Sequence, residues 1–122
     1  MKEYNFPPFS CHEIDMEDGT FMYSLVLPVF ADGTERATEL LEAHGVYPNG
    51  PGWEGVFAYL IHQHAPEWQN TMSFNSEGDA CLAEFQEEAH MIQVATFLQS
   101  VLADEARLTE YLANLPDEYR YV

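Results

Sequence analysis

The stretch SFNSEGDACLAEF, residues 73–85, groups three acidic residues and an asparagine around a single glycine. Its flanks alternate between apolar and polar residues, as two strands joined by a short turn do. Ser76-Glu77-Gly78-Asp79 would form the connection, and Gly78 is expected to adopt the positive φ of a tight hairpin turn. The stretch predicts an antiparallel hairpin. Met72 and Phe74 open its first strand, and Ala80–Phe85 form its second strand.

Two chemical alternatives for this stretch fail on its sequence. A calcium loop of the EF-hand type needs oxygen ligands at alternate positions before its glycine, but Ser73 stands at the first of them and only Glu84 matches. A catalytic pair of Glu77 and Asp79 would need burial to raise a pKa for acid catalysis, whereas a hairpin tip is exposed to water. Neither a metal site nor a catalytic site is expected here.

A second hairpin pattern lies near the N-terminus. Residues 21–27 alternate with period two and are rich in aromatic and apolar side chains, which predicts a strand. Asp18-Gly19 suits a tight turn, and Cys11–Met16 is a more polar partner, predicted to lie at a sheet edge.

Four helices are expected between and after the two hairpins. Asp32 is predicted to cap the first helix, with Glu35 three residues later, and Gly45 to end it. Pro51 suits the first turn of the second helix. The apolar stripe of this helix runs from Trp53 to His64, so His64 is expected to be partly buried. The last two helices are predicted from near Gln86 to Leu102 and from Asp104 to Leu115, followed by a loose or lightly docked tail.

The element order is therefore strand, strand, helix, helix, strand, strand, helix, helix. Hairpins segregated from helices favour an α+β fold in which the two antiparallel hairpins form a sheet packed against about four helices. With 122 residues and 47% hydrophobic residues, residues 1–122 suit a single compact domain.

The charge is the strongest compositional fact. Twenty-one acidic residues against four basic ones give a net charge of −17, and the basic residues are Lys2, Arg36, Arg107 and Arg120. Such a field repels nucleic acid and anionic membranes, because phosphate binding requires Lys and Arg. It attracts basic partners and raises their association rate, so a basic protein is the expected partner.

The remaining candidate motifs are weak. His62 and His64 on a helix point to opposite sides, and Cys11 and His12 on a strand do the same, so neither pair forms a metal site or a catalytic dyad. Asn49-Gly50-Pro51-Gly52 is rich in glycine but lacks the lysine of a phosphate loop. Trp53 lies on the apolar stripe and suits the core, whereas Trp68 is free to act as an interface anchor.

Three features favour a cytoplasmic address. The first 20 residues lack the apolar run of a signal peptide, and no segment is apolar for long enough to span a membrane. Cys11 and Cys81 do not form a disulfide framework, and both suit buried positions.

Three segments together resemble a known family. They are Asn49–Glu54 opening a helix, Glu67–Phe74 entering a strand, and Asn75–Ala80 followed by a long apolar helix and the Asp104–Leu108 start of the next. Their order and spacing resemble the immunity protein 51 family of bacterial polymorphic-toxin systems, most clearly over residues 45–115. That family shows a Gly-x-x-Trp helix start, a strand leading to an Asp-x-Glu-x-Gly turn, and a helix with an acidic, Leu-rich end.

The resemblance carries its own expectations. This chain has Asn75 where the family often has Asp, and Asp79 and Ala80 where it has more apolar residues. The family implies an α+β fold and a protein that neutralises a cognate toxin by binding it. It implies no catalytic residue and no cofactor.

The leading hypothesis is therefore a cytoplasmic, non-enzymatic immunity protein that binds a basic toxin, such as a nuclease, through acidic side chains. The alternative is a nucleic-acid mimic that inhibits a DNA- or RNA-binding protein. No direct nucleic-acid or membrane binding is expected, and self-association is left open. The candidate toxin contacts are Glu77, Asp79, Glu84, Glu87 and Glu88, with Asp15, Glu17 and Asp18 as a second patch and Trp68 as an anchor.

Overall fold

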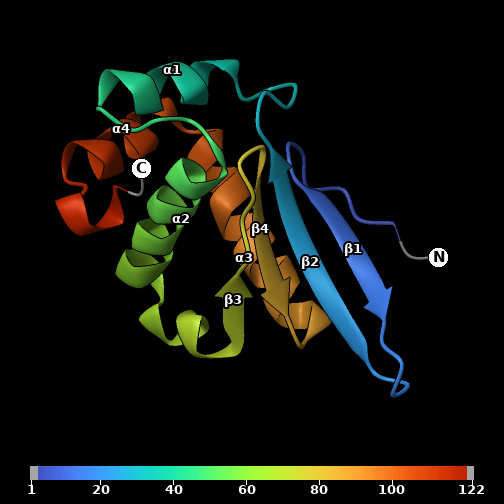
Figure 1. Cartoon of the computed structure of the whole chain (residues 1–122). Coiled ribbons are helices and arrows are strands. Elements are labelled where there is room, and N and C mark those ends of the chain that lie inside the picture. Colours follow the sequence, from blue (N-terminus) through green and yellow to red (C-terminus); the bar gives the residue numbers. More distant parts are fainter. Residues whose placement is uncertain (1–2, 121–122) are drawn as a thin grey trace.

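A four-stranded antiparallel sheet forms one layer of the molecule, and the helices form the other (Figure 1). The computed structural model describes residues 3–120. The strand order is β1-β2-β4-β3, so the two predicted hairpins join through β2 and β4. The strands are β1 (Ser10–Asp15), β2 (Phe21–Pro28), β3 (Met72–Phe74) and β4 (Ala80–Phe85).

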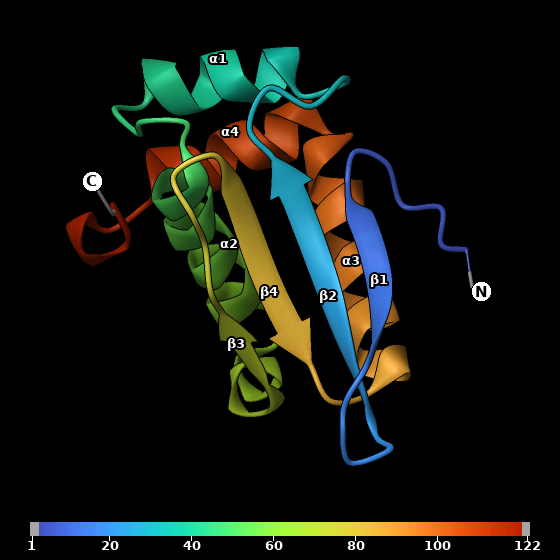
Figure 2. The same cartoon turned by 45° about the vertical axis from the view of Figure 1, so that its right-hand side comes forward.

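Two of the four α-helices, α2 and α3, pack on one face of this sheet, whereas α1 crosses one end of it and α4 packs against α1 and α3 (Figure 2). This arrangement confirms the predicted α+β fold. The helices are α1 (Glu35–Ala43), α2 (Gly50–His64), α3 (Glu88–Leu102) and α4 (Glu105–Ala113); two short 3₁₀ helices are η1 (Pro66–Thr71) and η2 (Asp117–Tyr119).

The period of two in β2 and β4 sorts the residues of the sheet into two faces. Leu25 pairs with Ala83 and Leu27 with Cys81, and all four are buried against the helices. The intervening pairs, such as Val26 with Leu82, point to the outer face, which no helix of the described chain covers (Figure 2). Antiparallel sheets tolerate one solvated face, so the hydrophobic core needs only a single layer of helices.

Helix α2 is the centre of the core. Trp53, Phe57, Leu60 and Ile61 are almost fully buried, as the predicted stripe requires. Each such side chain contributes about 1.5–3 kcal/mol when it leaves water. Asn49 caps the helix by accepting a 2.8 Å hydrogen bond from the Gly52 backbone N–H, and Pro51 lies in the first turn, as predicted.

The predicted cap of α1 is wrong. Thr34, not Asp32, is the N-cap residue, and its hydroxyl donates to the Ala31 carbonyl instead of capping the helix. Glu35 reaches back to accept a 3.0 Å hydrogen bond from the Gly33 N–H. The chain reaches α1 through Phe30, whose φ of 67° lies in the left-handed region. This turn positions the start of α1 without any contribution from Asp32.

The expected positive φ at Gly78 is also wrong, although the hairpin itself is confirmed. No residue of the β3–β4 connection has a positive φ, and the turn closes by paired hydrogen bonds between Glu77 and Ala80. The carbonyl of Gly78 accepts from the Gly50 N–H at 3.1 Å, and that of Asp79 accepts from the Val29 N–H at 2.9 Å. Because neighbouring segments fix these carbonyls, tertiary contacts determine the shape of the turn.

The C-terminal segment docks on the helices. Arg120 donates to the His44 carbonyl, and the Tyr119 ring lies 5.3 Å from the ring of Tyr59. Residues 116–120 are therefore held against α2. This agrees with the lightly docked form of the tail, one of the two forms expected from the sequence.

The first helical residue of α2 lies against the β3–β4 turn with no room for a side chain. A Cβ atom on Gly50 would lie 1.6 Å from the Glu77 carbonyl oxygen and 2.6 Å from that of Ala80. These are backbone atoms, so the contact could be relieved only by moving α2 away from the turn.

We expect Gly50→Ala to destabilise the protein by about 1–3 kcal/mol, the usual cost of overpacking, because the added methyl group meets backbone atoms. Gly78→Ala is the matched control, because a Cβ at Gly78 meets nothing within 4 Å. It should leave stability unchanged or raise it slightly by restricting the unfolded chain. Urea unfolding of both variants measures the difference, and equal midpoints would contradict the packing argument.

Candidate binding surface

The acidic residues predicted as contacts do not form one surface. β4 runs antiparallel to β2, and Phe85 pairs with Tyr23 near the start of β2. The end of β4 therefore lies beside the β1–β2 turn, and the β3–β4 turn lies at the opposite end of the sheet (Figure 2). We call the first group the hairpin end: Asp15, Glu17, Asp18, Glu84, Glu87 and Glu88. Glu77 and Asp79 lie at the other end.

The hairpin end contains carboxylates in different environments. Asp15, Glu17 and Asp18 are exposed, beside the exposed apolar residues Ile14, Met16 and Phe21. The Asp18 carboxylate accepts hydrogen bonds from the Thr20 hydroxyl at 2.6 Å and its N–H at 3.0 Å, and these bonds lower the pKa of Asp18. This carboxylate therefore rigidifies the turn as well as adding charge.

The three glutamates near the end of β4 differ in solvent exposure and in hydrogen bonding. Glu84 lies half-buried on the outer face, opposite Ser24 and Ser73. Glu88 accepts a 2.6 Å hydrogen bond from the Tyr4 hydroxyl, which, after burial, is a cause of the raised pKa of Tyr4. Glu87 is exposed. Of these three side chains, Glu87 is the most accessible to a partner.

Trp68 is half-buried in η1 rather than freely exposed. Its ring lies 5.3 Å from His64, 6.0 Å from Phe97 and 6.0 Å from His90. Trp68 and Glu87 line the same depression of about 330 Å³. The structure thus brings these two predicted contacts together around one depression.

The histidines near Trp68 differ from the sequence expectation. His64 is exposed instead of partly buried, although one face of its ring stacks on Phe97 at 4.0 Å. His62 is exposed, as predicted. Within residues 3–120, no group of three or more His, Cys, Asp or Glu side chains is arranged to hold a metal ion.

His90 is a buried polar group that the sequence did not single out. It is 9% exposed, its Nδ1 lies 3.0 Å from the Thr71 hydroxyl, and its Nε2 has no hydrogen-bond partner among the described residues. Burial lowers the pKa of His90, and the nearby Glu87 carboxylate opposes this shift. The imidazole is therefore held in its neutral form in the folded protein.

This burial predicts a specific pH dependence. Unfolded His90 takes up a proton near its ordinary pKa of 6.5, whereas the folded residue resists it. The contribution of His90 to stability is therefore complete above pH 6.5 and falls as the pH drops below it. His90→Phe should lose stability less steeply than the wild type between about pH 7 and 5, measured by urea unfolding at constant ionic strength. Parallel pH profiles would contradict a buried, neutral His90.

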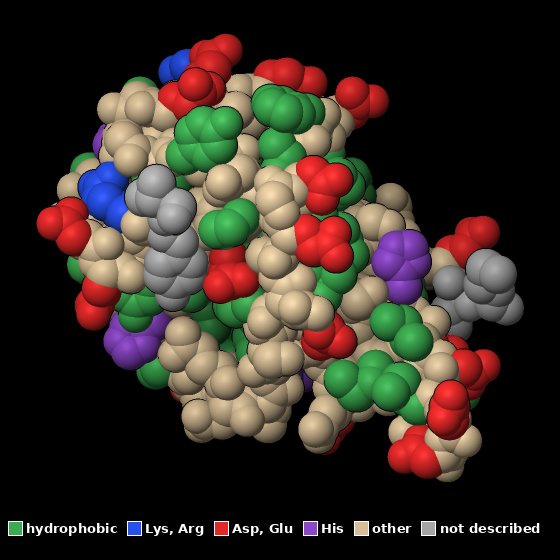
Figure 3. Space-filling model, in the orientation of Figure 1, with side chains coloured by type: hydrophobic (Ala, Val, Ile, Leu, Met, Phe, Trp, Pro, Cys, Tyr) green, Lys and Arg blue, Asp and Glu red, His purple; other side chains and the backbone are tan. Residues whose placement is uncertain are grey.

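The arginines of the described chain all have partners. Arg36 contacts Glu105 at 2.6 Å and Glu39 at 2.9 Å, which links α1 to α4. Arg120 contacts Asp117 at 3.4 Å. Exposed pairs of this kind contribute little to stability, but they leave few free cations beside the many carboxylates. Figure 3 shows acidic side chains spread over the visible face and basic ones only towards its left side.

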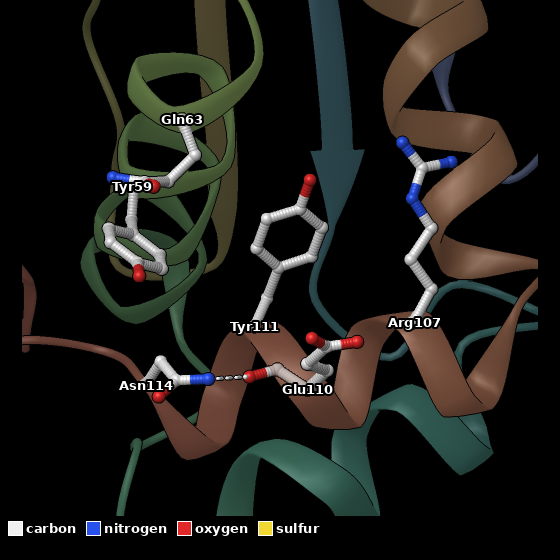
Figure 4. Close-up of a pocket in the computed structure, with 6 residues that line it drawn as sticks. All are labelled: Tyr59, Gln63, Arg107, Glu110, Tyr111 and Asn114. Atoms are coloured by element: carbon white, nitrogen blue, oxygen red, sulfur yellow. Dashed lines mark hydrogen bonds between the residues drawn. The ribbon is translucent and has the colours of Figure 1, made fainter.

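Arg107 lines the depression between α2 and α4, which measures about 620 Å³ (Figure 4). Its guanidinium lies 5.4 Å from the centre of the Phe97 ring and donates to the Ser100 hydroxyl at 3.3 Å. Tyr111 stands between Tyr59 and Arg107 in this view, and Asn114 donates to the Glu110 carbonyl at 2.9 Å. The depression is open, and its arginine is already engaged by Ser100 and Phe97.

The opposite end of the sheet carries exposed aromatic residues that the sequence reasoning missed. Phe30 is 82% exposed and Tyr47 is 67% exposed. Both line a depression of about 490 Å³ together with the acidic residues Glu42 and Asp79. We call this group the loop-end surface: Val29, Phe30, Glu42, Tyr47, Pro48, Asn49, Gly78 and Asp79. The sequence did contain a signal for this surface: each of two turn-rich loops carries an aromatic residue that belongs to no apolar stripe.

Comparison with known families agrees with this architecture. The family model described as immunity protein 51 matches residues 14–115, which include β2, β3, β4 and the four α-helices. The chain belongs to the immunity protein 51 family. Neither the comparison with curated proteins nor that with solved structures gave a match.

Membership of the immunity protein 51 family makes this chain an immunity protein against a toxin. Such a protein binds a cognate toxin, so its exposed surfaces become the relevant sites. Among the helices of residues 3–120, none is long and apolar enough to cross a bilayer.

Proposed function

We propose that this chain is a cytoplasmic immunity protein of interbacterial competition, which neutralises a basic toxin domain, such as a nuclease, by binding it through an acidic surface. The observation that carries the proposal is the family match over residues 14–115 together with the net charge of −17. Blocking requires only binding, so we propose no catalytic step. The partner is a protein, with no direct contact to nucleic acid or membrane.

The charge supports a basic partner on physical grounds. A small soluble domain is well served by a net charge of magnitude about 2–8. The value of −17 exceeds this range, and the excess repulsion destabilises the compact state. A partner rich in Lys and Arg would relieve that repulsion and would be steered towards the complex by the same field.

The direct test is co-expression with the toxin domain encoded by a neighbouring gene. We expect the chain to rescue growth of the toxin-expressing cells and to co-purify with the toxin at a fixed ratio. A neighbouring toxin that is neither neutralised nor bound would overturn the proposal. Equal inhibition of several unrelated DNA-binding proteins would instead favour the nucleic-acid mimic.

A second test uses ionic strength. If the acidic field steers association, the association rate constant should fall steeply between about 0.05 and 0.5 M salt, because the Debye length shrinks. The dissociation rate constant should change less. Stopped-flow mixing measures both, and an association rate independent of salt would show that the charge does not guide binding.

A further inference from the structure

The loop-end surface combines two exposed aromatic residues with two carboxylates around one depression. Resting on the proposed function, we propose that this depression receives a lysine or arginine side chain of the toxin. The cation would lie against Phe30 and Tyr47 and pair with Glu42 and Asp79.

The aromatic residues are the first step of the argument. Among the large hydrophobic residues between positions 3 and 120, Phe30 is the most exposed, at 82%, and Tyr47 follows at 67%. Single exposed apolar residues are common, but two aromatic side chains lining one depression are typical of an interface. The φ of 67° at Phe30 is unfavourable for a residue with a bulky side chain, and glycine or asparagine would suit it better. Folding alone therefore does not account for a phenylalanine at this position.

The carboxylates make the depression selective for a cation. No side chain of residues 3–120 donates to the Glu42 or Asp79 carboxylate, whereas Glu105 and Asp18 are engaged by Arg36 and Thr20. A cation that meets both an aromatic face and a free carboxylate gains from cation–π attraction and from charge pairing. An anion or a phosphate would meet only repulsion there.

The backbone holds this surface in place before binding. The Val29 N–H donates to the Asp79 carbonyl at 2.9 Å, which ties the segment before Phe30 to the β3–β4 turn. The Gly50 N–H donates to the Gly78 carbonyl at 3.1 Å and ties the start of α2 to the same turn. Because the groups are positioned in advance, binding loses less conformational entropy. The upper part of Figure 3 shows large hydrophobic side chains at the surface with acidic ones around them.

The hairpin end is the competing surface. It also combines acids with exposed apolar residues, but it projects beyond the rest of the sheet (Figure 1). A projecting tip can enter a cleft of a partner, yet it does not enclose a single side chain. The two ends therefore predict different effects of the same change in charge.

The experiment compares two double variants that remove the same charge. Glu42→Gln with Asp79→Asn changes the loop-end surface, and Asp15→Asn with Glu17→Gln changes the hairpin end. With the co-purifying toxin domain, we expect the loop-end variant to lose affinity about tenfold or more, mostly through faster dissociation. The hairpin variant should lose about threefold or less, mostly through slower association. Equal losses in the two variants, or a larger loss in the hairpin variant, would overturn the proposal.

The variant Phe30→Gly tests whether the Phe30 ring contributes to toxin binding. It also distinguishes a loss of binding from a loss of stability. Glycine suits the positive φ, so the urea midpoint should stay equal or rise, while toxin affinity falls about tenfold. Wild-type affinity in this variant would overturn the proposal. A loss with Phe30→Gly but none with the loop-end charge variant would mean that the depression holds an apolar side chain, which contradicts the cation.

A peptide probe separates this inference from the proposed function. The blocked tripeptide Gly-Arg-Gly, titrated in NMR, should shift the amide signals of the loop-end surface more than the neutral citrulline analogue does. Equal shifts from both peptides, no shifts, or shifts mainly at the hairpin end would overturn the inference. Failure of the toxin to bind at all, with the peptide result intact, would count against the proposed function alone.

Discussion

The contact between Gly50 and the β3–β4 turn is the constraint on which the rest of the structure depends. The helix start can approach the Glu77 and Ala80 carbonyls only because Gly50 has no side chain. This approach sets α2 against β4, and α2 supplies Trp53 and Phe57 to the core. The Gly50–Gly78 and Val29–Asp79 hydrogen bonds then bring three loops together. The loop-end surface follows from the packing of the core.

Electrostatics works against this fold rather than for it. The three arginines of the described residues already have partners within the chain, and the carboxylates greatly outnumber them. The core of aromatic and aliphatic side chains must offset the resulting repulsion. A surface that destabilises the free protein makes sense when a basic partner neutralises it. The acidic composition thus agrees with the immunity function implied by the family.

Local patterns predicted most of the secondary structure, because apolar periodicity reports which side of an element is buried. Leu25, Leu27 and the stripe of α2 lie where period two and period 3.6 place them. The prediction of a positive φ at Gly78 was wrong because hydrogen bonds from distant segments hold that turn. The prediction of a cap at Asp32 was wrong because local hydrogen bonds of Thr34 and Glu35 shape the start of α1. The presence of Phe30 and Tyr47 around one depression could not be predicted, since it depends on loops that meet only in the folded chain. Likewise, sequence alone could not tell that the predicted acids lie at two ends of the sheet.

The central claim is that the toxin binds at the end of the sheet where three loops converge. Amide hydrogen exchange of the chain, free and bound to its toxin domain, tests this most directly. If the toxin binds there, we expect the backbone amides of residues 29–34, 44–50 and 75–80 to exchange more slowly in the complex. Exchange in the β1–β2 hairpin should be unchanged. Protection confined to residues 14–21, with the converging loops unaffected, would contradict it.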